Sequence, residues 1–184
     1  MVLFSWSCVP DQSTIINTAD SFYDINGLID EQIKMLDSIS PSIVKKAIIG
    51  ADEEMTEEDP TTWSKEMNIF RSADINKPLL RDSYEVSNIS TGNFKTILYK
   101  SKRPDGTIVD ELSIELIQGS QKPVKVIASL NSKNPLFKSV KTLEMYFQNV
   151  DGKQMLSKYK SQGWQKMISK DSTYYSIVAE VLYP

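Results

Sequence analysis

The spacing of apolar residues changes once along this chain, and that change limits the possible folds more than any other feature. Between Ser21 and Pro41 apolar residues recur every three or four positions, which predicts an amphipathic helix capped by Ser21 or Asp24. The residues of this stripe are Ile25, Leu28, Ile29, Ile33 and Leu36. Beyond Pro78 the spacing falls to about two and stays there to the end of the chain, which predicts strands.

The second half of the chain therefore reads as a succession of strands separated by turn residues. The strand-like runs are residues 83–90, 93–101, 107–118, 123–132, 139–148, 154–169 and 173–183. A hairpin turning at Gly50-Ala51 precedes them, in residues 42–56. Helices followed by closely connected strands predict an α+β fold. We expect the N-terminal helices to pack on a curved antiparallel sheet of about six or seven strands, with a half-open barrel as one form of it.

A second helix is predicted over residues 59–74, where Asp59 can cap the start and Pro60 can take the first helical position. Trp63, Met67 and Phe70 follow helical spacing, so we expect this stripe to pack on the sheet. Within the strand run 107–118, alternation places Asp110, Leu112, Ile114 and Leu116 on one face. It places Val109, Glu111, Ser113 and Glu115 on the other.

Composition removes several classes of function. The 184 residues carry a net charge of −3, so no basic field favours nucleic acid as a partner. A single cysteine excludes an internal disulfide and a thiolate zinc site. The absence of histidine removes the commonest general base in catalysis. No apolar run approaches the roughly 18 residues of a membrane-spanning helix. We expect one domain over residues 21–184, with no cofactor and no metal.

The N-terminal stretch MVLFSWSC contains the single cysteine, Cys8, after apolar and small residues. Small residues before a cysteine suit lipoprotein processing, so we interpret residues 1–20 as a truncated lipoprotein signal and tether with Cys8 as the lipidation site. Only seven residues precede Cys8, none of them basic, so this interpretation assumes an upstream start. Acyl chains on Cys8 would hold the domain at a membrane. The alternative is a free cysteine that packs as a small apolar residue.

Four stretches together resemble uncharacterised lipoproteins of Bacteroidetes-type bacteria. They are SFYDINGLIDEQIKML, WSKEMNIFRSADINKPLLRDSY, NPLFKSVKTLEMYF and GWQKMISKDSTYYSIVAEV. The resemblance implies a lipidated cysteine, a helix, a small hairpin, a second helix and a terminal β-meander. It therefore implies a lipid-anchored, periplasm-facing protein of the bacterial cell envelope. It implies no catalytic residues.

Three groups of side chains are candidates for chemistry. The acidic run 52–59 lacks the ligand spacing of a calcium loop, and we interpret it as a solvated hairpin arm. Two carboxylates on the predicted strands could form the catalytic pair of a glycosidase. Alternating charged residues on a solvent-exposed face of a sheet would produce the same pattern. These carboxylates are Asp110, Glu111, Glu115 and Glu144. Aromatic residues crowd the sheet half, where they fill a core or line a ligand face. The candidate ligand-binding residues are Phe94, Tyr99, Tyr146, Phe147 and Trp164.

The sequence thus favours a non-enzymatic, lipid-anchored binding module that holds a hydrophobic ligand on the concave face of its sheet. The first alternative is a protein-binding adaptor or structural subunit of an envelope complex, which would use the exposed sheet edge or the 50–59 arm. The second alternative is a carboxylate-dependent hydrolase, which requires two carboxyl groups converging in a cleft. An enclosed apolar cavity would favour the first function, and a flat apolar patch over a filled core would favour the adaptor.

Overall fold

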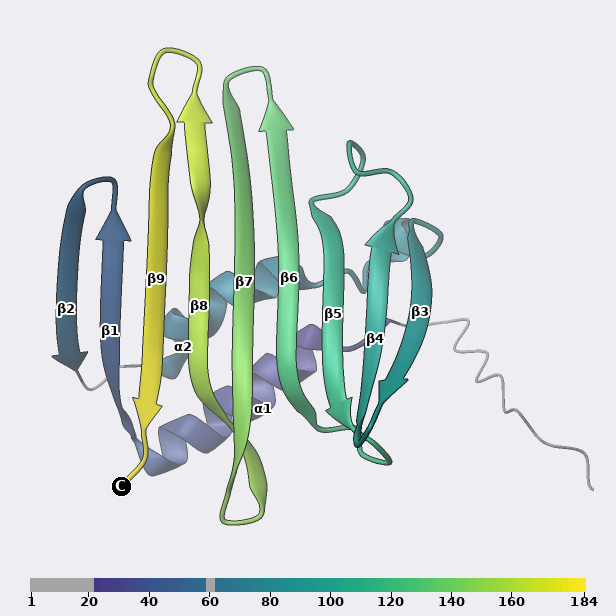
Figure 1. The fold of residues 1–184 in the computed structure, drawn as a ribbon, viewed down its shortest axis with the longest axis vertical. Helices are drawn as coiled ribbons and strands as arrows, with labels where there is room; N and C mark the ends of the chain where they lie inside the picture. The colour runs from purple at the N-terminus through teal and green to yellow at the C-terminus, as the bar shows by residue number, and fades with distance from the viewer. Residues whose placement is uncertain (1–21, 59–61) are drawn as a thin grey trace, which may run out of the picture.

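The fold is α+β, with helices on one face of a single antiparallel sheet of nine strands (Figure 1). The computed structural model describes residues 22–58 and 62–184. The strand order is β2-β1-β9-β8-β7-β6-β5-β4-β3. The strands are β1 (Ser42–Ile49), β2 (Asp52–Glu58), β3 (Tyr84–Thr91), β4 (Phe94–Ser101), β5 (Val109–Ile117), β6 (Pro123–Asn134), β7 (Phe137–Val150), β8 (Lys153–Met167) and β9 (Thr173–Leu182). The α+β class and the antiparallel meander are confirmed.

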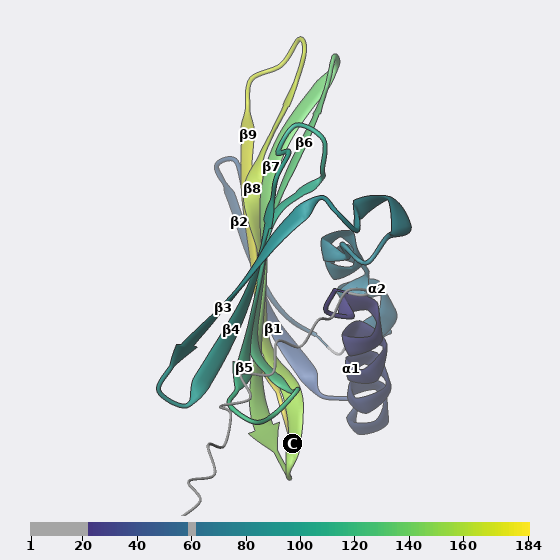
Figure 2. The same cartoon turned by 90° about the vertical axis from the view of Figure 1, so that its right-hand side faces the viewer.

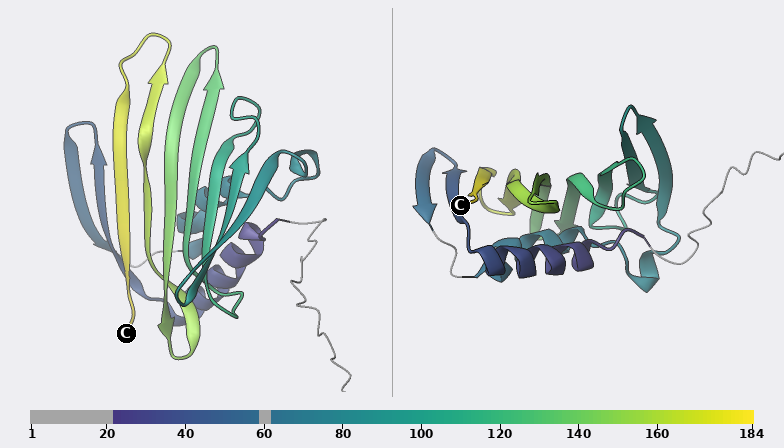
Figure 3. Two further views of the ribbon diagram at one scale, coloured as in Figure 1. Left: turned by 45° about the vertical axis from the view of Figure 1, so that its right-hand side comes forward. Right: turned by 90° about the horizontal axis from the view of Figure 1, so that it is seen from below.

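The predicted number of strands, six or seven, was too low. The N-terminal hairpin β1–β2 joins the same sheet, because β1 pairs antiparallel with the C-terminal strand β9. The sheet does not close into a barrel, since β2 and β3 remain as its two edges (Figure 3). Spacing alone identifies strands, but it carries no information about a pairing between segments this far apart in sequence.

The first predicted helix is confirmed as α1 (Ile25–Ile39). Its start is fixed by Asp24, whose carboxylate accepts a hydrogen bond of 2.8 Å from the Gly27 N–H. It ends at Ser40, which adopts a left-handed conformation with φ of 52°, directly before Pro41. The buried side chains of the helix are Ile25, Leu28, Ile29, Gln32 and Leu36.

The second helix is shorter than the spacing predicts. The α-helix α2 (Trp63–Met67) continues as a 3₁₀ helix, η1 (Asn68–Ala73), and a further 3₁₀ turn, η2 (Pro78–Leu80), follows. The helical stretch stops at Asp74, whose backbone is extended and whose carboxylate accepts hydrogen bonds from the Asn76 N–H and the Asn26 side chain, both at 2.9 Å. The predicted cap Asp59 and Pro60 lie outside the described residues.

The helices pack against one face of the sheet, and the core lies between the two layers (Figure 2). The predicted packing stripe is confirmed, because Trp63, Met67 and Phe70 are all buried. Phe70 contacts the β8 residue Tyr159 edge to face, with ring centres 5.6 Å apart. Beside this contact Glu66 accepts a hydrogen bond from the Tyr159 hydroxyl and lies 3.0 Å from the Lys45 ammonium group. These contacts hold α2 on the sheet.

One predicted face assignment is wrong. The pairing of β5 with β6 shifts register between Val109 and Glu111, and Val109 is buried in the core rather than sharing the wet face of Glu111. An extra residue in a strand reverses the alternation on one side of it, so strict period two fails at this bulge. No helix within residues 22–58 and 62–184 is both long enough and apolar enough to cross a membrane.

Candidate functional site

The sheet has one face without a helical layer, which we call the open face. Tyr159 contacts Phe70 and so faces the helices, and alternation along β8 turns Lys160 and Trp164 to the other side. Within the described residues, the two views of the fold place no helix over this face (Figures 2 and 3). Side chains that line it are therefore available to a ligand.

A shallow groove with a volume of about 350 Å³ lies on the open face around Trp164. The pairing of β7, β8 and β9 places Val140, Trp164 and Tyr174 in one row across three strands. The side chains lining the groove are Ile48, Val140, Thr142, Gln162, Trp164, Tyr174, Tyr175 and Ser176, together with Gly50 and Gly163. None of these residues is charged. The arrangement offers aromatic and aliphatic surface with a few hydroxyl and amide groups to orient a ligand.

Gly163 lies where a side chain would meet the backbone of the paired strand β7. A Cβ atom at this position would lie 2.1 Å from the carbonyl oxygen of Val140 and 3.0 Å from the Cα of Lys141, so only glycine fits. At the end of the groove, the Gly50 N–H donates to the Tyr174 carbonyl at 2.9 Å. Backbone contacts between the strands therefore fix the positions from which the side chains of the groove extend.

A polar cluster occupies the middle of the open face. The Tyr146 hydroxyl donates a hydrogen bond of 2.5 Å to Glu144, and the Lys160 ammonium group lies 3.9 Å from the same carboxylate. Lys125 lies over the Tyr146 ring, 5.4 Å from its centre. The hydrogen bond to Glu144, together with burial, raises the pKa of Tyr146 to about 12. Tyr146 thus stays protonated and acts as a donor, and the cluster balances charges across neighbouring strands.

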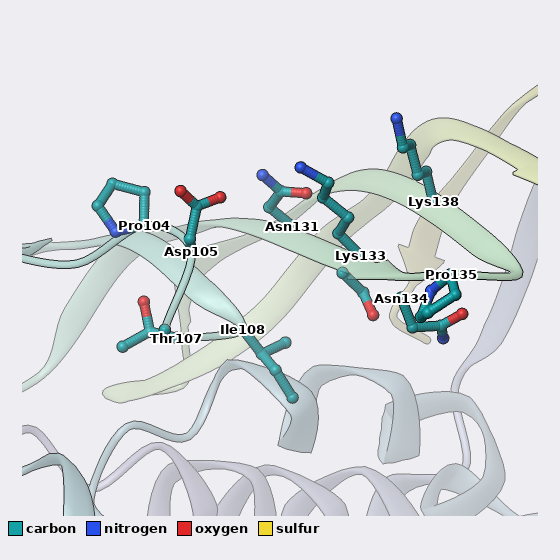
Figure 4. Close-up of a pocket in the computed structure, with 11 residues that line it drawn as sticks. Pro104, Asp105, Thr107, Ile108, Asn131, Lys133, Asn134, Pro135 and Lys138 are labelled. Carbon is teal, nitrogen blue, oxygen red and sulfur yellow. The ribbon is translucent and has the colours of Figure 1, made fainter.

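A second hollow, of about 670 Å³, opens between the β4–β5 loop and the β6–β7 hairpin (Figure 4). Asp105, Asn131, Lys133 and Lys138 point to one side of the strands, whereas Ile108 points toward the helices. One carboxylate oxygen of the neighbouring Asp110 is buried without a hydrogen-bond partner. Burial raises the pKa of Asp110, and a hydrogen bond from Asn131 opposes the rise. Mixed charges line this hollow, so it does not suit an apolar ligand.

A third hollow, of about 560 Å³, lies between α1 and the turns that join β5 to β6 and β7 to β8. Its wall combines apolar residues such as Leu28 and Met35 with the charged side chains of Glu31, Lys122 and Lys153. In the part of the chain that the structure describes, no three Asp, Glu or Cys side chains gather as metal ligands.

The candidate residues taken from the sequence do not form one cluster. Tyr99 and Phe147 are buried in the core, and the Tyr99 hydroxyl accepts a hydrogen bond from the Tyr23 N–H at 3.2 Å. Tyr146 and Trp164 share the open face, whereas Phe94 begins β4 at the sheet's far side and is 42% exposed. Cys8 lies outside the described residues.

The sequence interpretation missed the partners of Trp164, chiefly Ile48, Val140 and Tyr174. Their positions follow from the register of β1, β7, β8 and β9, which adjacent spacing does not reveal. Of the carboxylates proposed for a hydrolase pair, Glu144 has a structural role, because it accepts a hydrogen bond from the Tyr146 hydroxyl and lies near the Lys160 ammonium group. Comparison of the chain with protein-family models, curated proteins and solved structures finds no significant match.

Proposed function

We propose that this protein is a non-enzymatic binding module of the bacterial cell envelope, anchored by acyl chains on Cys8 and facing the periplasm. We place its ligand, a hydrophobic molecule, in the groove around Trp164. The observation that carries this proposal is the row of Val140, Trp164 and Tyr174 on a sheet face that no described helix covers. Aromatic rings left accessible to water cost free energy that a bound apolar surface recovers.

The groove also limits the chemistry of the ligand. Its volume of about 350 Å³ is at the small end of the range for small-molecule sites, which begins near 300 Å³. Its lining carries no charge, so an uncharged ligand avoids the cost of losing its hydration. Thr142, Gln162 and Ser176 supply the hydrogen bonds. The best fit is a neutral molecule with one or two flat apolar rings and few polar groups.

Replacement of Trp164 by alanine is expected to weaken binding of a neutral aromatic probe about tenfold, or ~1.4 kcal/mol. The probe is N-phenyl-1-naphthylamine, whose fluorescence rises on transfer from water to an apolar site. The measurement is a titration of the purified full chain with this probe. The loss follows from removal of the largest ring in the groove.

Two variants accompany this titration. Trp164→Phe keeps a ring in the groove and is expected to retain most of the affinity. Ile89→Ala removes an apolar side chain on β3, outside the groove, and is expected to bind as the unmodified chain does. Equal binding by the unmodified chain and Trp164→Ala would exclude the groove as the site.

The anchor is tested separately, by intact mass of the protein produced from its native locus with any upstream codons. We expect a species that begins at Cys8 and carries diacyl- or triacylglyceryl mass, and we expect globomycin treatment to remove it. A product that retains the residues before Cys8, with an unmodified thiol, would refute the anchor and leave the groove hypothesis intact.

The second candidate function is a protein-binding adaptor, and the exposed edge strand β3 favours it. Val86 and Ile89 are half-exposed on this eight-residue strand, and Glu85 is its only charged residue. The other edge, β2, has the acidic sequence DEEMTEE. Uncharged edges accept an added strand, whereas charged edges resist one. An Ile89→Lys variant that loses an envelope partner while Trp164→Ala retains it would favour this function.

A further inference from the structure

Two hairpins project beyond the rest of the sheet and end in a common tip. β6–β7 and β8–β9 extend past the ends of the neighbouring strands (Figure 1). Their turns contact each other, because the Ile168 N–H donates to the Leu136 carbonyl at 3.1 Å and Phe137 pairs with Met167. In the first turn the Leu136 N–H donates to the Asn134 side chain at 2.9 Å, which fixes the turn beside Pro135.

The tip carries three exposed apolar residues. Leu136 is 66% exposed, Met167 54% and Ile168 72%. Turn residues are usually small or polar, and single exposed apolar residues need no explanation. Leu136, Met167 and Ile168 are adjacent, however, and form an apolar patch on a projecting part of the sheet. Such a patch marks a surface that binds another molecule or a membrane.

A row of lysines lies next to these apolar residues, on one face of the sheet. Lys133, Lys138 and Lys166 lie directly opposite one another on β6, β7 and β8. Like charges in this arrangement repel, and the structure pairs none of the three with an acidic side chain within residues 22–58 and 62–184. Lys170 lies in the second turn.

The local charge is opposite in sign to that of the whole chain. Residues 133–138 and 166–171 contain four lysines and one acidic residue, Asp171, so the tip carries a net charge of +3 within a chain of −3. Asp105 is the acidic residue that lines the hollow beside Lys133 and Lys138. Lysines side by side without acidic partners repel one another and lower stability, and contact with a negatively charged surface would remove that cost.

We infer that this tip docks on the surface of an anionic phospholipid bilayer. Leu136, Met167 and Ile168 enter the boundary between headgroups and acyl chains, and the lysines contact lipid phosphates. A protein partner is less suited, because a standard interface uses roughly 20–30 residues a side, more than two narrow turns supply.

This contact does not depend on the Cys8 anchor or on the groove ligand. It would give the module a second attachment and so a defined orientation at the membrane. The test therefore uses the full chain carrying Cys8→Ser, in which no acyl chain contributes to binding. Cosedimentation is measured with vesicles of phosphatidylcholine mixed with phosphatidylglycerol and with vesicles of phosphatidylcholine alone.

We expect binding to the anionic vesicles, weakening with added salt, and little binding to the neutral ones. The triple variant Lys133→Gln, Lys138→Gln, Lys166→Gln is expected to bind the anionic vesicles about a hundredfold more weakly. The double variant Leu136→Ser, Ile168→Ser is also expected to weaken binding, through loss of the inserted apolar surface. All altered side chains are at the exposed tip, so circular dichroism should report an unchanged fold.

The matched control removes three exposed lysines from the helical side of the molecule, Lys34, Lys65 and Lys77, by replacement with glutamine. It changes the net charge equally and is expected to bind as the parent chain does. No binding to anionic vesicles, or an equal loss in the control, would overturn the inference. A loss in the tip variants alone supports it.

Discussion

Replacement of Gly163 by alanine is expected to lower the free energy of unfolding by at least about 3 kcal/mol. The added Cβ would lie 2.1 Å from the Val140 carbonyl oxygen and 3.0 Å from the Lys141 Cα, and both atoms belong to the backbone of the paired strand. A flexible side chain could move aside, but a ladder of strand hydrogen bonds cannot. The strands β7 and β8 must therefore separate locally, at the centre of the sheet.

Urea unfolding followed by circular dichroism measures this effect as a lower transition midpoint. Gly106→Ala is the matched control, because the nearest atoms to its added Cβ lie at an ordinary 3.5 Å. We expect the control to change stability by no more than about 0.5 kcal/mol. Equal midpoints for the two variants would show that a Cβ at position 163 does not clash with the backbone of β7.

The same close approach links stability to the proposed ligand site. Gly163 precedes Trp164, and the pairing that it permits keeps Trp164 opposite Val140. We therefore expect Gly163→Ala to disturb probe binding as well as folding. Trp164→Ala, in contrast, should affect binding without a comparable loss of stability, because its side chain faces the open side of the sheet.

Much of the fold could be predicted from local patterns. The apolar stripe identified α1, with Ser21 and Asp24 as the two candidate caps, and alternation identified each strand from β3 to β9. Pairing between distant segments could not be predicted in this way. The union of β1 with β9 depends on which sheet edge the hairpin meets, and no local spacing encodes that choice.

The candidate site was predictable only in part, for the same reason. Trp164 was one of the aromatic residues proposed to bind a ligand, but the residues around it are brought together by strand register. Tyr99 and Phe147 were assigned to a ligand face and are buried in the core. Their strands are apolar on both faces near the middle, so alternation did not distinguish inside from outside.

Gln32 is the clearest residue that sequence patterns missed, and its replacement by leucine is expected to cost about 3 kcal/mol. The side chain is buried on the sheet-facing side of α1. Its amide group donates to the Gln154 carbonyl at 3.0 Å, and its oxygen accepts from the Leu156 N–H at 2.8 Å. Leucine has a similar volume but removes the partners of the buried Leu156 N–H and of the partly buried Gln154 carbonyl.

The location of these hydrogen bonds explains the size of the effect. The pairing of β7 with β8 shifts register between Tyr146 and Phe147, so Ser157 has no opposite residue. Such a bulge turns backbone groups out of the ladder, and Gln32 supplies the partners that the strand lacks. Lys34→Leu is the control, since it places the same residue at an exposed position of the same helix and should leave stability nearly unchanged.

A Gln32→Glu variant separates hydrogen bonding from shape. Burial favours the neutral carboxyl, so the folded-state pKa of Glu at position 32 would lie above its unfolded value. The folded state then binds more protons than the unfolded state, and stability relative to the unmodified chain falls as pH rises through the folded pKa. At low pH the protonated carboxyl can donate to Gln154 and accept from Leu156, as the amide does. We therefore expect this variant to recover stability relative to the unmodified chain on acidification, whereas Gln32→Leu stays destabilised at every pH. A deficit in Gln32→Glu that does not change with pH would contradict this role of the two hydrogen bonds, because glutamate keeps the shape of glutamine and regains a donor only when it is protonated.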